Sequence, residues 1–179
     1  MPLRDVLVEE LRDMYSAENQ LVKALPKLAK AANNAKLKEL FTAHLEETKG
    51  QVERLKEIFE RLEEKPTGEH CDGMEGIVEE GKNALEKDEE GASFDVGLIG
   101  AALRTEHYEI AAYQAAISMA KTLGMQDVID LLTENLNEEM AAAAKITEAA
   151  KPILLESAEE PEQRKKPKLP KRANPSCRT

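Results

Sequence analysis

Residues 103–117, LRTEHYEIAAYQAAI, indicate which fold this chain adopts. Apolar residues recur at intervals of three and four, which is the spacing of one face of an amphipathic helix. The stripe of the helix expected over residues 94–122 nevertheless contains Glu106, and Glu109 competes with Ile110 for the next inward position. A buried carboxylate without a partner costs several kcal/mol. This pattern therefore predicts a helical core in which cations or polar partners offset the charge of buried glutamates.

Three further long helices repeat this pattern, over residues 3–32, 36–64 and 126–151, with Pro152 expected to end the last one. Their apolar stripes contain Glu18, Glu47 and Glu139 respectively, and the second stripe also contains His44 and Gln51. A short helix is expected over residues 74–86, between two segments rich in turn residues. The order of these elements predicts two helical hairpins joined by a long crossover.

The composition agrees with an all-α protein that is not embedded in a membrane. Of 179 residues, 41% are hydrophobic but only 3% are aromatic, and no segment alternates in the manner of a strand. No apolar run approaches the roughly 20 residues that cross a bilayer, and the N-terminus lacks the apolar core of a signal peptide. Cys71 and Cys177 are expected to be free thiols in a reducing compartment. We therefore expect a cytoplasmic protein.

The last residues of the chain differ in charge from the rest. The net charge is −10, yet residues 161–179 contain seven basic residues and one acidic residue. We predict a four-helix bundle over residues 1–155 and a basic, proline-rich, disordered tail over residues 156–179. Such a tail could bind DNA through phosphates, and the alternative is a solvated extension.

Carboxylates and imidazoles that converge in one core suit iron or manganese ions. Two such ions need bridging oxygens, which glutamates supply while cancelling charge. The alternative interpretation is a set of buried polar residues paired with Lys, Arg or Gln. We predict a di-iron centre, with manganese as the other candidate ion. Its expected ligands are Glu18, His44, Glu47, Glu106, Glu109 and Glu139.

Three segments of the chain resemble the YciE/YciF family of ferritin-like proteins. They are residues 11–21 (LRDMYSAENQL), 44–51 (HLEETKGQ) and 106–113 (EHYEIAAY). The resemblance implies a ferritin-like fold, a homodimer, a role in stress responses and a ferroxidase activity. The ferritin-like template has Glu-x-x-His on two helices, but Gly50 and Ala142 stand where the histidines would be. His44, one turn before Glu47, is the expected substitute.

Three functions remain open from the sequence. The first is a di-iron protein that acts as a ferroxidase or consumes peroxide, with O2 or peroxide as its partner, in stress protection. The second is a non-catalytic protein that sequesters metal or binds DNA through its tail. The third is a helical scaffold with a vestigial polar core. Whether the chain is an enzyme is left open at this point.

Overall fold

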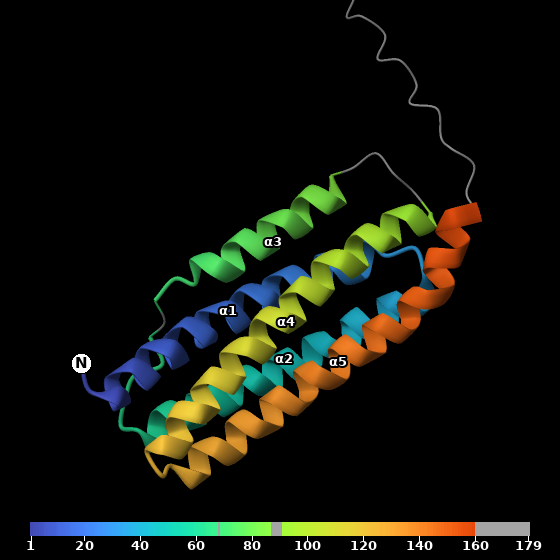
Figure 1. Cartoon of the computed structure of the whole chain (residues 1–179). Coiled ribbons are helices and arrows are strands. Elements are labelled where there is room, and N and C mark those ends of the chain that lie inside the picture. The colour runs from blue at the N-terminus through green and yellow to red at the C-terminus, as the bar shows by residue number, and fades with distance from the viewer. Residues whose placement is uncertain (68, 87–90, 160–179) are drawn as a thin grey trace, which may run out of the picture.

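The structure, a computed structural model, describes residues 1–67, 69–86 and 91–159 and is helical almost throughout (Figure 1). Its five helices are α1 (Leu3–Ala31), α2 (Ala35–Arg61), α3 (Asp72–Leu85), α4 (Ala92–Thr122) and α5 (Gln126–Glu159). The hairpin of α1 and α2 packs against the hairpin of α4 and α5, and α3 lies outside the bundle along α1 and α4. The predicted four-helix bundle with an extra helix in its crossover is confirmed.

Two polar side chains, Asn34 and Asp95, stabilise the turn between α1 and α2. The Asn34 side chain caps α2 by accepting hydrogen bonds from the backbone N–H groups of Lys36 and Leu37. Asp95 of α4 is buried, and its carboxylate accepts from the backbone N–H groups of Asn33 and Asn34 at 2.8 and 2.6 Å. These bonds satisfy backbone donors in the α1–α2 turn and attach that turn to the second hairpin.

The expected end of the last helix at Pro152 was wrong. Both Pro26 and Pro152 lie inside helices, and α5 continues to Glu159. Ile153, directly after the proline, is 1% exposed and belongs to an apolar cluster with Ile146 and Ala150. Packing of Ile153 offsets the hydrogen bond that the proline cannot donate. Residues 156–159 of the predicted tail are therefore helical, and its residues 160–179 lie outside the described chain.

Two apolar clusters fill the bundle, one toward each end. One contains Leu7, Leu11, Phe59, Ile117 and Leu132, among others. The other contains Leu37, Phe41, Leu98, Ile99 and Ile146, among others. Neither cluster includes the buried glutamates, so the polar residues form a separate layer between two hydrophobic ends.

The outer helix α3 has its own apolar contact with the bundle. Met74 and the buried free thiol of Cys71 pack against Ala17, Leu21 and Leu25 of α1. In the described part of the chain, no helix is long and apolar enough to cross a membrane.

Candidate metal centre

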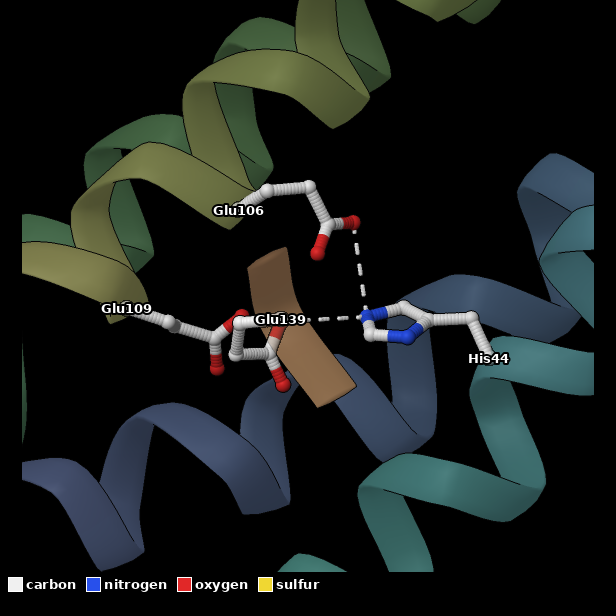
Figure 2. Close-up of side chains that lie close together, drawn as sticks. All are labelled: His44, Glu106, Glu109 and Glu139. Atoms are coloured by element: carbon white, nitrogen blue, oxygen red, sulfur yellow. Dashed lines mark ion pairs between the residues drawn. The ribbon is translucent and has the colours of Figure 1, made fainter. Parts of the chain in front are cut away.

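Four buried side chains from three helices meet in the polar layer (Figure 2). They are His44 of α2, Glu106 and Glu109 of α4, and Glu139 of α5, and none is more than 3% exposed. One ligand atom from each lies within 4.8 Å of those of the others. His44 Nε2 lies 3.4 Å from Glu106 Oε1 and 3.6 Å from Glu139 Oε2. The three helices thus bring four of the six predicted ligands together.

Glu18 adjoins this cluster from α1, the one bundle helix that contributes no member of the four-residue group. Its side chain is 1% exposed, and its Oε1 accepts a hydrogen bond from the Tyr113 hydroxyl. Burial, followed by repulsion from Glu139, raises the pKa of Glu18 well above its ordinary value. Burial and then repulsion from Glu18 raise the pKa of Glu109 in the same way. The carboxylates of Glu18, Glu109 and Glu139 therefore form one electrostatically linked group.

Glu47 lies at the rim of the cluster instead of at its centre. Its side chain is 28% exposed, and Thr48 takes the fully buried position beside it. Glu47 Oε2 lies 3.2 Å from His44 Nδ1, and Oε1 accepts from Lys145 Nζ at 3.3 Å. The hydrogen bond with His44 and the charge of Lys145 lower the pKa of Glu47. The alternative interpretation, carboxylates paired with Lys, Arg or Gln, thus describes Glu47 beside Lys145 and one oxygen of Glu139 beside Gln51, but not Glu106 or Glu109.

The buried carboxylates present several oxygens that have no hydrogen-bond partner within the described chain. They are Glu18 Oε2, Glu106 Oε2, both oxygens of Glu109, and Glu139 Oε2. Burial raises the pKa of Glu106 and Glu109 well above the ordinary value, and neighbouring carboxylates add to that effect. Such oxygens need either protons or cations to offset their desolvation.

This donor set fits a hard or borderline cation. Carboxylate oxygens with one imidazole suit iron or manganese, and the absence of thiolates among the clustered ligands disfavours a zinc–thiolate site. His44 Nε2 faces Glu106 and Glu139 without making a hydrogen bond of good geometry in the described structure. A lone pair on that nitrogen is therefore available to a metal ion when His44 is neutral.

A hydrogen-bonded chain supports the cluster on the side of α2 and α5. Gln51 Nε2 donates to Glu139 Oε1 and to Glu138 Oε2. Arg54 forms an ion pair with Glu138, and its Nε donates to Asn135 Oδ1 at 2.6 Å. Gln51, which the sequence places in the inward stripe of its helix, is thus buried against a candidate ligand.

The same chain continues to the opposite side of the cluster. Asn135 Nδ2 donates to the Tyr113 hydroxyl at 2.9 Å, and Tyr113 in turn donates to Glu18. Asn135 is fully buried, whereas the neighbouring Leu136 is only partly buried. Sequence reasoning missed Asn135 and Arg54. A polar residue four positions before Glu139 was the signal that could have revealed Asn135.

Other candidate groups point elsewhere. His107 is exposed, and its ring lies against the Leu103 carbonyl. His70, Asp72 and Glu75 form an exposed group that is separate from the buried cluster. Tyr15 makes an edge-to-face contact with Phe59, whereas Tyr113 donates a hydrogen bond to the candidate ligand Glu18.

Residues 2–159 match the family described as Domain of unknown function (DUF892). The chain belongs to the DUF892 family. This DUF892 chain is 44% identical to the Escherichia coli protein YciF over 149 residues, which cover 83% of the chain and 90% of YciF. The resemblance to the YciE/YciF family is thereby confirmed.

Solved structures show the same fold. The crystal structure of the E. coli stress protein YciF matches with a TM-score of 0.83 and 42% identity, over 86% of this DUF892 chain and 98% of that structure. YcfI from Rhodopseudomonas palustris matches with a TM-score of 0.79 and 41% identity, over 82% and 94% of the two chains. A Xanthomonas campestris protein, 23% identical over 88% and 97% of the two chains, shares the fold with a TM-score of 0.67.

Proposed function

We propose that this DUF892 chain is a di-iron protein that oxidises ferrous iron or consumes peroxide in protection against stress. The observation that carries the proposal is the group of unpartnered carboxylate oxygens in a buried layer with one imidazole. Their ionised forms are costly in the buried interior unless cations offset the charge. The description of YciF as a stress protein supports the biological setting.

The side chains have distinct roles in this proposal. His44, Glu106, Glu109 and Glu139 would hold the metal directly, and Glu18 would add a carboxylate from α1. Glu47, partly exposed at the rim, would capture arriving cations and pass them inward beside His44. Iron bound there supplies one-electron redox chemistry between its ferrous and ferric states. Manganese is the alternative ion for the same ligands.

The surrounding residues orient these ligands. Tyr113 fixes one oxygen of Glu18, and Gln51 fixes one oxygen of Glu139, so the other oxygen of each carboxylate is left free to bind. Partners of this kind raise the affinity and define the geometry of a metal site. The two apolar clusters above and below the layer exclude water from it. A homodimer, which the family resemblance implies, and a cytoplasmic location, which the two cysteines expected to be free favour, remain part of the proposal.

A ferrous titration tests the proposal. Metal-free full-length protein is titrated anaerobically with ferrous iron, metal per chain is measured, and air or peroxide is then added while ultraviolet absorbance is recorded. Glu106→Gln removes one ligand charge at nearly constant volume, and Glu53→Gln is the matched exposed control. Two irons per chain with rapid, saturable oxidation, lost in Glu106→Gln but not in Glu53→Gln, would support the oxidase.

The same titration separates the alternatives. Tight iron or manganese binding without oxidant consumption would favour a metal-sequestering protein. Equal binding by the wild type and Glu106→Gln would overturn the metal centre and leave a helical scaffold. The tail beyond residue 159 lies outside the described chain, so DNA binding remains a prediction from its charge, and salt-sensitive binding lost on truncation at residue 160 would test it.

A further inference from the structure

A small cavity lies between α1 and α4, next to the carboxylate layer. It is lined on one side by Met14 and Ala17 of α1, and on the other by Tyr108, Ala112 and Tyr113 of α4. About 10 Å³ is open to the centre of a water-sized sphere, which is room for about one water molecule. The cavity is thus too small for an organic substrate.

The inner end of this cavity is formed by candidate metal ligands. Glu18 and Glu109 line it, and their side chains are 1% and 3% exposed. Glu18 Oε2 and both oxygens of Glu109 have no hydrogen-bond partner among the described residues. The cavity therefore lies directly beside two carboxylates of the candidate centre.

The outer end is bounded by side chains whose positions are fixed. Tyr108 and Ala112 are partly exposed, and the Tyr108 hydroxyl donates to Asp13 Oδ2 at 3.3 Å and lies 3.1 Å from Cys71 Sγ. Gly73, at the start of α3, lies so close that a Cβ there would be 2.7 Å from the Tyr108 hydroxyl. These contacts hold the tyrosine ring at the mouth of the cavity.

We propose that this cavity is the entry route and docking position for a small uncharged oxidant, O2 or hydrogen peroxide. The inference rests on the proposed function, because it assigns the side from which the oxidant reaches the same metal centre. Met14, Ala17 and Ala112 offer no group that could replace the water shell of a divalent cation. A small uncharged molecule loses far less hydration free energy than a divalent cation on entering such a passage.

The geometry separates this route from that of the cation. Glu47, with its partly exposed carboxylate, faces α5 through Lys145 on the seam between α2 and α5. The cavity lies between α1 and α4. The α1–α4 seam is on the opposite side of the bundle from the α2–α5 seam (Figure 1). Metal and oxidant thus approach the layer from opposite faces.

Binding of nitric oxide tests the route without relying on turnover. Nitric oxide is an uncharged diatomic probe, and its adduct with ferrous protein is followed anaerobically by stopped-flow absorbance and paramagnetic resonance. Ala112→Leu should fill the passage and slow adduct formation about tenfold or more, at unchanged iron per chain. Ala111→Leu, the same change on the exposed neighbouring position of α4, should leave the rate unchanged. Tyr108→Ala should widen the mouth and raise the rate.

Each result of this experiment decides the question. Ala112→Leu that binds iron and forms the adduct at the wild-type rate would overturn the route. If Ala112→Leu fails to fold, Tyr108→Ala decides, and no increase over the wild type would overturn it. Repeating the mixing with O2 and with hydrogen peroxide identifies which oxidant the passage admits. Normal nitric oxide binding without oxidation of iron would contradict the proposed function alone, and absence of ferrous binding would remove both.

Discussion

The Tyr113 hydroxyl joins Glu18 to Asn135 inside the bundle, and it donates one hydrogen bond while accepting another. Its side chain is fully buried. Loss of the hydroxyl leaves a carboxylate oxygen and an amide donor without partners in a dry environment. A single tyrosine thereby connects the ligands of the candidate centre to the side chains that orient them.

Tyr113→Phe is therefore expected to lower the free energy of unfolding of the metal-free protein by about 1–3 kcal/mol. Tyr15→Phe is the matched control, because Tyr15 is partly exposed and its ring packs edge-on against Phe59. The control should stay within about 0.5 kcal/mol of the wild type. Urea unfolding of both variants, followed by circular dichroism, gives the values. Equal losses in the two variants would contradict the role assigned to Tyr113.

At the same scale, the sequence predicted which carboxylates are buried better than it predicted the residues that contact them. Glu18, Glu106 and Glu139 break apolar stripes, so helical periodicity alone indicates that they face inward. Glu47 followed the same logic but lies at the rim, because the adjacent Thr48 satisfies its own hydroxyl on the His44 carbonyl and can be buried. Arg54 could not be predicted, because its role depends on which side chains of α5 lie across from it.

At the scale of the helices, period and turn signals located all five elements, but the end of α5 depended on tertiary packing. A proline ends a helix when no tertiary contact stabilises the turn that follows it. Here Ile153 packs into the cluster around Ile146, and Ser157 lies within hydrogen-bonding distance of Ser93 on α4. Contacts between distant residues cannot be read from the local sequence around Pro152.

Ile153→Ala should therefore destabilise the protein by about 2–4 kcal/mol, because it removes a buried side chain after the proline. Leu155→Ala, two residues later, removes a side chain that is 70% exposed and should change stability by less than about 0.5 kcal/mol. Chemical denaturation of the two variants in parallel measures the difference. If both variants matched the wild type, the turn after Pro152 would contribute nothing to the folded state.

Across the whole molecule, the bundle places a charged layer between two apolar ends. The pairing of two hairpins followed from the sequence, since each half shows a polar cluster near the middle of its stripes. The near-complete burial of these polar side chains could not be predicted from the sequence, because it depends on how the four helices pack against one another. That arrangement makes global stability sensitive to the protonation of the layer.

The pH dependence of the metal-free protein should reveal this sensitivity. Burial raises the pKa of Glu18, Glu106 and Glu109 above the ordinary value of 4.5, so the folded state keeps protons that the unfolded state has lost. Where the folded state binds more protons, stability falls as pH rises. The contribution of these groups is thus fully present below about pH 4.5 and is lost as pH rises toward their folded-state pKa values. Glu47, whose pKa is lowered, contributes in the opposite direction, present above its unfolded pKa and lost as acid protonates it.

Glu109→Gln isolates the effect of the buried layer from that of the surface charge. In the metal-free state, this variant should be close to the wild type in melting temperature at pH 5 and more stable at pH 8, because the amide is never ionised. Calorimetry at constant ionic strength measures both. Saturating metal should reverse the order at pH 8, since a ligand at 100 times its Kd adds about 2.7 kcal/mol to the wild type. A metal-free wild type that is more stable than Glu109→Gln at pH 8 would mean that other contacts neutralise the layer, and that cations are not needed to do so.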